Sequence, residues 1–164
     1  MNNIIDFINI QNLPQKLNFA GSDFVNIMNS DCSKVKEIII KDDACVKFID
    51  CKGFTGSYDF SQASELNLAD SDFSKAQYVK LGRTSFADET IMPVVVDMTC
   101  CDNLETPFNQ DFTHTKTCIM KKGASYSIAL ASILKEKGVD VVYFGDEEND
   151  DVGFFGRLFS RGRD

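Results

Sequence analysis

The run Asp72-Phe-Ser-Lys-Ala-Gln-Tyr-Val-Lys-Leu81 repeats a pattern that occurs twice before it in the chain. The earlier copies are Asp31-Cys-Ser-Lys-Val-Lys-Glu-Ile-Ile-Ile40 and Asp59-Phe-Ser-Gln-Ala-Ser-Glu-Leu-Asn-Leu68. A second pair of segments, Leu17-Asn-Phe-Ala-Gly-Ser-Asp-Phe24 and Leu66-Asn-Leu-Ala-Asp-Ser-Asp-Phe73, is identical at six of eight positions. Such internal repeats are typical of a solenoid, in which each repeat packs only on its neighbours.

Apolar-x-apolar triplets form two interleaved series with a nearly constant step of about 20–21 residues, a period typical of solenoid repeats. The first series is Leu17/Phe19, Ile38/Ile40, Tyr58/Phe60 and Val79/Leu81, and the second is Val25/Ile27, Val46/Phe48 and Leu66/Leu68. Alternate residues of a strand point to one side, so each coil should contain two short strands with the apolar pairs inward. The spacers are rich in Ala, Gly, Ser and Asp, which are small or favour turns, and the side chains of Asp and Ser can accept backbone N–H bonds there.

The register is weaker after residue 86, but Val94-Val-Val-Asp-Met98 and Cys118-Ile-Met120 continue it. We therefore expect five or six coils between about residue 8 and residue 120, with loops at 88–90 and 102–107.

The last third of the chain changes to a helical period. Within residues 124–137 the apolar positions are 126, 129, 130, 133 and 134, which predicts an amphipathic helix with Ser125 as N-cap and Gly138 just after its end. A strand is predicted at 139–144. This helix and strand would cap the C-terminal coil, and residues 4–10 would cap the other end. We thus expect one domain at 1–144, with repeats at about 8–123 and the cap at 124–144.

Residues 145–164 form an acidic linker and a tail that contains Phe154, Phe155, Arg157, Leu158 and Phe159. A flexible tail is the simplest interpretation. The alternative is a linear motif that docks on a partner or a membrane surface.

The chain of 164 residues carries 17 basic and 25 acidic side chains, for a formal charge of −8. This balance argues against direct nucleic-acid binding, which needs clustered Lys and Arg. The acidic excess provides solubility or matches a basic partner surface. No apolar run is long enough to cross a bilayer, and the first residues lack the features of a secretory signal. We expect a cytoplasmic protein.

The six cysteines include no CxxC pair, and His114 is the only histidine, so no ordinary zinc ligand set is present. Reduced, buried cysteines are the simplest expectation, and metal binding or disulfides are the alternatives. Cys100 or Cys101 could be drawn with His114 and Asp111 as nucleophile, base and orienter. No nucleophile elbow or glycine-rich phosphate loop accompanies them, so we expect neither catalysis nor a cofactor.

Two segments, Ala63-Ser-Glu-Leu-Asn-Leu-Ala-Asp-Ser-Asp-Phe73 and Ala76-Gln-Tyr-Val-Lys-Leu-Gly-Arg-Thr-Ser-Phe86, resemble the LxxLxLxxNxL template. In this respect residues 13–86 are similar to bacterial leucine-rich-repeat-like proteins with LDFSxVxxLNLSGADLS-type repeats. The resemblance implies protein–protein recognition without catalysis, in the bacterial cytoplasm or in a host cell into which the protein is delivered. The first template starts at residue 63 and the second already at residue 76. This short step favours a two-faced, mainly β solenoid with about 20–21 residues per coil.

The middle residue of each triplet should point outward. These residues are Asn18, Ile39, Asp59 and Lys80 in the first series and Asn26, Lys47 and Asn67 in the second. A row of polar side chains on rigid strands predicts a surface that binds a protein partner. One alternative is a solvated face without a ligand. Another is an acidic inhibitor, encoded on a mobile element, that blocks the basic groove of a nucleic-acid enzyme.

Overall fold

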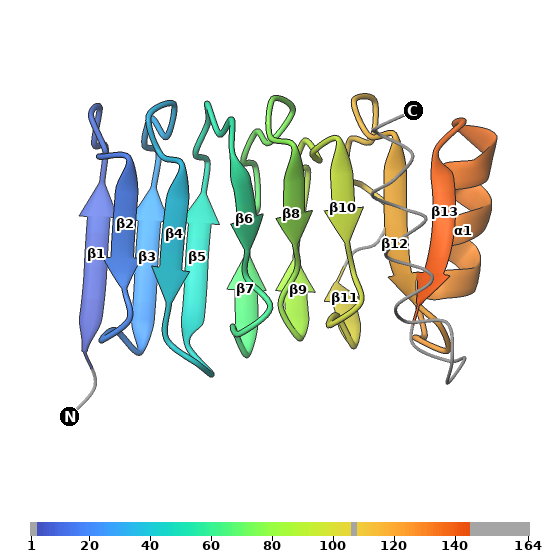
Figure 1. Ribbon diagram of the computed structural model, residues 1–164, viewed down its shortest axis with the longest axis horizontal. Coiled ribbons are helices and arrows are strands. Elements are labelled where there is room, and N and C mark those ends of the chain that lie inside the picture. The colour runs from blue at the N-terminus through green and yellow to red at the C-terminus, as the bar shows by residue number, and fades with distance from the viewer. Residues whose placement is uncertain (1–2, 106–107, 145–164) are drawn as a thin grey trace, which may run out of the picture.

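The computed structural model describes residues 3–105 and 108–144, which form a parallel β-solenoid of about seven turns with about 21 residues per coil (Figure 1). The strands are β1 (Ile4–Ile8), β2 (Lys16–Phe19), β3 (Phe24–Met28), β4 (Glu37–Ile40), β5 (Cys45–Ile49), β6 (Ser57–Asp59), β7 (Glu65–Asn67), β8 (Tyr78–Lys80), β9 (Thr84–Phe86), β10 (Val95–Asp97), β11 (Asn103–Glu105), β12 (Thr117–Lys121) and β13 (Asp140–Phe144), and the helix is α1 (Ser127–Glu136).

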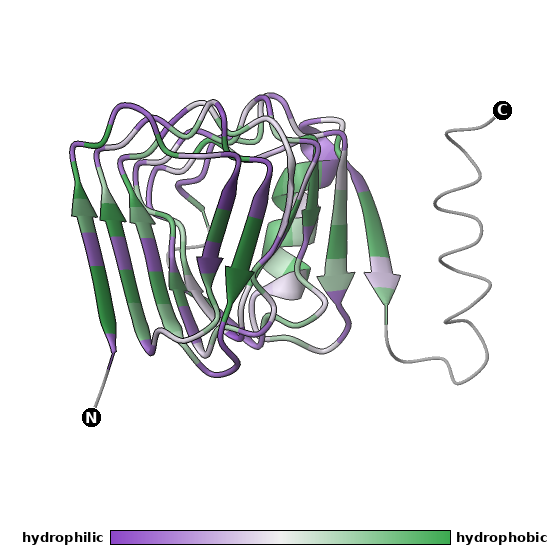
Figure 2. Cartoon of the chain, turned by 60° about the vertical axis from the view of Figure 1, so that its left-hand side comes forward, coloured by the Kyte–Doolittle hydropathy of each residue, from purple (hydrophilic) through white to green (hydrophobic). Residues whose placement is uncertain are grey.

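The strands up to β12 alternate between two layers, because each coil before the last contributes one strand to each (Figure 2). Sheet A has the order β1-β3-β5-β7-β9-β11. The opposite layer, called here layer B, consists of the pair β2-β4 followed by the sheet β6-β8-β10-β12-β13. All strand pairs are parallel, as expected when equivalent strands of successive coils lie side by side. The predicted mainly β solenoid is confirmed.

The predicted register is also confirmed, because the inward residues of each series stack on one another. Val25 pairs with Val46 and Val46 with Leu66 in sheet A. In layer B, Tyr58 pairs with Val79. Burial of these repeated positions supplies the main driving force for stacking the coils. They belong to one continuous core that extends from Leu13 to Val139.

The core is most aromatic in the middle coils. The ring of Phe54 is stacked on that of Phe73, with 4.1 Å between centroids and 13° between planes. Phe48 and Tyr58 meet Phe54 edge-on, at 5.8 and 5.4 Å. All four side chains are at most 1% exposed. Phe54 lies outside the strands, so the spacing of triplets gave no signal for it.

Several predicted boundaries are wrong. Residues 4–8 are not a cap but the first strand of sheet A, where Ile5 and Phe7 pack on the core. The predicted loop at 102–107 contains β11, whose Leu104 is 4% exposed. The triplet pattern did not predict β9, because the inward residue of this strand is the polar Ser85. The hydroxyl of Ser85 donates to the carbonyl of Gly82 (3.1 Å). The solenoid therefore has more coils than the five or six expected.

Asp side chains accept backbone N–H bonds in many of the turns, as the sequence predicts, and Asn18 and Asn67 do the same in others. In each case a carboxylate or amide oxygen accepts the backbone N–H two residues later, which is an Asx turn. Three of these Asp residues begin the copies of the ten-residue repeat. They are Asp31 (2.9 Å to Ser33 N), Asp59 (2.8 Å to Ser61 N) and Asp72 (2.8 Å to Ser74 N).

One corner of the solenoid is made by residues with positive φ. They follow the first five strands of sheet A, one per coil, and are Asn9, Asn29, Asp50, Asp70 and Glu89, with φ between 47° and 60°. The backbone N–H of four of them donates to the next coil, for example from Asp50 to the carbonyl of Ala69 (3.0 Å). Asn and Asp tolerate this left-handed conformation better than other non-glycine residues, so the corner explains why they recur there.

The C-terminal coil is closed by α1 and β13. In this coil α1 takes the place of a sheet A strand, since it lies between β12 and β13 in the chain. Gly138 follows the helix with φ 80°, as predicted. The prediction of Ser125 as the N-cap residue is wrong. The helix begins at Ser127, after Tyr126, and no side chain caps its N-terminus. Its buried stripe is Ser127, Leu130, Ala131 and Leu134, whereas position 129 of the predicted stripe is exposed and position 133 is half-buried.

No helix within residues 3–105 and 108–144 is long and apolar enough to cross a membrane. The predicted acidic linker and the tail residues Phe154, Phe155, Arg157, Leu158 and Phe159 lie outside the described residues.

Candidate protein-binding face

The predicted outward residues lie on two separate faces of the solenoid. Asn26, Lys47 and Asn67 are in register on adjacent strands of sheet A. Asp6 extends this row at the N-terminal end, where its Oδ1 accepts a hydrogen bond from Asn26 Nδ2 (3.0 Å). The row crosses the strands nearest the N-terminus as a hydrophilic band (Figure 2).

The other four residues lie on the outer face of layer B. Asn18 pairs with Ile39 on β2 and β4, and Asp59 pairs with Lys80 on β6 and β8. Asn18 and Asp59 also accept backbone N–H bonds within their own turns, at 3.1 and 2.8 Å. Their residue types are therefore explained in part by the fold itself.

Two apolar rows flank the polar row of sheet A. One consists of Ile4, Phe24 and Cys45, and the other of Ile8, Met28 and Ile49. Ile4, Ile8 and Phe24 are 66%, 53% and 41% exposed, and the other three are half-buried. We call these six residues, together with the polar residues Asp6, Asn26 and Lys47, the apolar-rimmed face.

Sequence reasoning missed the apolar rims because it considered only the central residue of each triplet. The signal was available, since residues two positions before and after that centre point to the same side of a strand. In Phe24-Val-Asn-Ile-Met28 the outward set is Phe24, Asn26 and Met28.

The outer face of layer B is less accessible near its C-terminal end. Asp97 and Ile119 are outward positions on β10 and β12, yet they are 1% and 0% exposed. The Asp97 carboxylate is fully engaged. Its Oδ1 accepts from the N–H and the hydroxyl of Thr99 (2.9 and 2.7 Å), and its Oδ2 accepts from the hydroxyl of Tyr78. Burial and this carboxylate raise the pKa of Tyr78, which therefore stays protonated.

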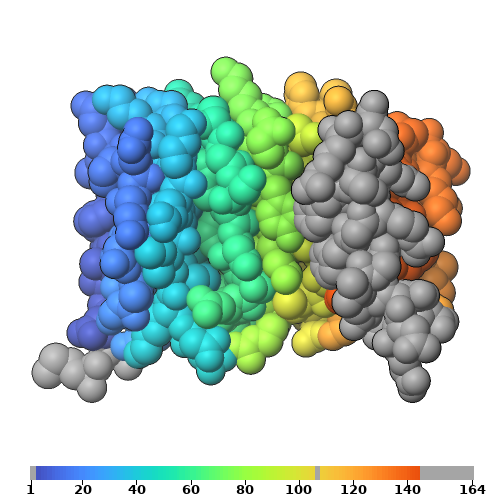
Figure 3. All heavy atoms as spheres, in the orientation of Figure 1, coloured from blue at the N-terminus to red at the C-terminus, as the bar shows by residue number. Residues whose placement is uncertain are grey.

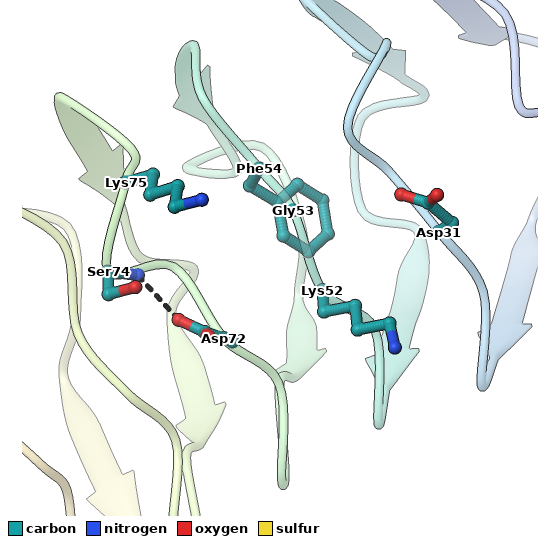
Figure 4. Close-up of a pocket in the computed structure, with 7 residues that line it drawn as sticks. All are labelled: Asp31, Lys52, Gly53, Phe54, Asp72, Ser74 and Lys75. Atoms are coloured by element: carbon teal, nitrogen blue, oxygen red, sulfur yellow. Dashed lines mark hydrogen bonds between the residues drawn. The ribbon is translucent and has the colours of Figure 1, made fainter.

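A pocket of about 250 Å³ opens at the edge between the two layers, lined by three successive coils (Figure 4). Asp31 and Asp72 lie on either side of the segment that contains Gly53 and Phe54. Hydrogen bonds from Ser33, first of all from its backbone N–H, lower the pKa of the Asp31 carboxyl. Both carboxylates hold Asx turns, so the structure gives them a role in the turns of this edge.

The cysteines are free thiols. Cys32, Cys51, Cys101 and Cys118 are buried, whereas Cys45 and Cys100 are half-buried. Within residues 3–105 and 108–144, no group of three or more His, Cys, Asp or Glu side chains is placed to hold a metal ion.

The hypothetical catalytic set is not assembled by hydrogen bonds in the part of the chain that the structure describes. Burial raises the pKa of Cys101 to about 11, so its thiol stays protonated at neutral pH. His114 is exposed, and Asp111 Oδ1 accepts from Thr113 N (2.8 Å). Hydrogen bonds from Thr113, first from its side chain and then from its backbone, lower the pKa of Asp111.

Comparisons of the chain with protein-family models, with curated proteins and with solved structures return no match.

Proposed function

We propose that the chain is a non-enzymatic protein-binding module whose partner contacts the apolar-rimmed face. One observation carries the proposal: Ile4, Ile8 and Phe24 are large apolar side chains that stay exposed on a regular sheet. Clustered apolar exposure of this kind is typical of an interaction surface. The strands already have their final geometry, so little conformational entropy is lost on binding.

The arrangement favours a partner with a matching amphipathic strip. Burial of a large apolar side chain contributes about 1.5–3 kcal/mol, so a few such contacts supply affinity. The row between the rims carries both charge signs, with Asp6 at one end and Lys47 at the other. Complementary charges on the partner would fix its orientation. The free thiols support a reducing compartment such as the bacterial cytoplasm.

The proposal is tested by affinity capture from an extract of the organism that encodes the chain, followed by mass spectrometry. Wild-type protein is compared with the double variant Ile8→Ser, Phe24→Ser. The matched control is Ile128→Ser, which removes another exposed isoleucine (83% exposed) from α1. A partner retained by wild type and control but lost by the double variant supports the proposal. Captured proteins that do not differ between the double variant and wild type contradict it.

A second candidate function is that of an acidic inhibitor of a nucleic-acid enzyme. It is favoured by the corner of residues with positive φ, where Asp50, Asp70 and Glu89 are exposed on successive coils, beside the exposed Asp88. Such a column could occupy a basic groove. The triple variant Asp50→Asn, Asp70→Asn, Glu89→Gln should then lose binding to its partner, whereas the Ile8, Phe24 variant should keep it.

A further inference from the structure

The two ends of the solenoid differ. β1 and β2 are the terminal strands of their layers, and the first coil forms one end of the molecule while α1 and β13 form the other (Figures 1 and 3). Because α1 replaces a sheet A strand in the last coil, the N-terminal end is the one at which residues 3–105 and 108–144 present two strand edges. A hollow of about 350 Å³ opens there, lined mainly by apolar residues of the first coil, including Phe7, Ile10, Leu13, Leu17 and Phe19.

The backbone at this end has groups available for pairing. The carbonyl of Asn3 accepts from Phe24 N and the N–H of Asn9 donates to Met28 O, so odd-numbered residues of β1 face β3. The N–H and C=O of Ile4, Asp6 and Ile8 therefore point away from β3, towards the open end. The carbonyl of Gln15, just before β2, faces β4, so by the same alternation the backbone N–H and C=O of Lys16 and Asn18 face the open end.

An exposed pair of edges of this kind is a template for pairing with another chain. The segment is also poor in charge. Between residues 3 and 22 the only charged side chains are Asp6 and Lys16, in a protein in which 26% of residues are charged. Depletion of charge is a mark of the centre of protein interfaces.

We propose that two copies of the chain associate through this end, with β1 of each copy pairing antiparallel with β2 of the other. The two-fold axis then runs parallel to the strands, and sheet A of one copy continues into layer B of its partner. Only a two-fold arrangement is closed, since the opposite end of the solenoid has no equivalent pair of edges in the part of the chain that the structure describes.

The pitch of the solenoid selects this pairing. Successive strands in one layer are about 4.8 Å apart, so β2 lies about half that distance, roughly 2.4 Å, further along the axis than β1. When β1 of each copy meets β2 of the other, the two offsets between β1 and β2 compensate each other. Both β1–β2 contacts between the copies then reach hydrogen-bonding distance at the same time. If β1 met its own counterpart instead, the two β2 strands would be left about 4.8 Å too far apart.

Charge selects the same arrangement. Asp6 and Lys16 both project from outer faces, and the proposed axis brings Asp6 of one copy and Lys16 of the other onto one face of the joined sheet, on adjacent strands. Opposite charges on neighbouring strands are favourable and like charges are not. Pairing of β1 with its own counterpart would instead bring the two Asp6 carboxylates together near the axis.

The end is small, because a five-residue strand is about 17 Å long and packed layers lie about 10 Å apart. The dimer therefore buries less than the roughly 800 Å² per partner of a standard interface. We expect a dissociation constant in the micromolar range.

Sedimentation equilibrium of the chain, from low micromolar to high micromolar concentration, measures the association. Asp6→Lys and Lys16→Asp should each weaken the association of the two copies about tenfold. Each change places like charges at residues 6 and 16 of opposite copies, and the two-fold symmetry makes this happen twice. The double variant Asp6→Lys, Lys16→Asp restores the opposite charges and should regain most of the wild-type affinity. Glu136→Lys on α1, a charge reversal at the other end, should have no effect.

Asp6→Pro provides a second variant. The N–H of residue 6 points to the open edge, so proline removes a donor used between copies and leaves the pairing of β1 with β3 intact. Circular dichroism confirms that each variant is folded. A wild-type chain that stays monomeric at all concentrations overturns the proposal. So does a dimer that neither single charge reversal weakens.

Discussion

Replacement of Phe54 by alanine should destabilise the protein more than any other single truncation outside the strands. Its ring is fully buried and contacts the rings of Phe73, Phe48 and Tyr58, so the change leaves a cavity in the middle coils. Truncation of a buried phenylalanine costs about 3–5 kcal/mol, and lost aromatic pairs add about 0.5–1.5 kcal/mol each. The loss is thus a large share of the roughly 5–15 kcal/mol by which a domain is stable.

Urea unfolding followed by far-ultraviolet circular dichroism measures this loss, and thermal unfolding should show a drop of about 10 °C or more. Phe54→Leu keeps most of the volume and should cost about half as much. Phe7→Ala, in the first coil, removes a half-buried ring that meets Phe19 edge-on at 6.3 Å, and should cost less than Phe54→Ala. Equal costs for Phe54→Ala and Phe7→Ala would refute the idea that the middle coils hold the densest part of the core.

Four further outcomes are expected. Gly53→Ala should destabilise the protein by about 1–2 kcal/mol in urea unfolding, because φ is 90° and the added Cβ would lie 3.0 Å from a backbone nitrogen. Glu89→Asn should stabilise it by about 0.5–1 kcal/mol, since asparagine suits the left-handed conformation at φ 53°. The lowered pKa values of Asp31 and Asp111 mean that their ionised forms favour the fold, so the melting temperature should fall as pH drops below about 4. A thiol reagent should label the two half-buried cysteines in native protein and the four buried ones only after unfolding.

The solenoid could be predicted from the sequence because the same short pattern of apolar residues recurs from coil to coil. Inward pairs such as Val46/Phe48 and Leu66/Leu68 recur once per coil, and their nearly constant spacing determines which strands become neighbours. The turns followed from the same repeats, since Asp31 and Asp72 accept the N–H bonds expected of them.

What sequence reasoning missed depends on contacts between coils. β9 pairs normally although Ser85 replaces the usual apolar residue, because its hydroxyl finds a carbonyl partner within the core. The apolar rims become a surface only once Ile4 and Phe24, which belong to successive coils, are placed side by side.

The stacking of the coils also determines how the protein responds to mechanical force. The described chain begins in the first coil and ends in the last, at opposite ends of the stack (Figure 1). Tension between these ends acts along the hydrogen bonds that join neighbouring coils, so it opens them one after another instead of shearing many strands at once. Each coil of about 21 residues releases about 70 Å of extended chain. The molecule therefore lengthens in regular steps under load, and the coils that have not yet opened keep their structure.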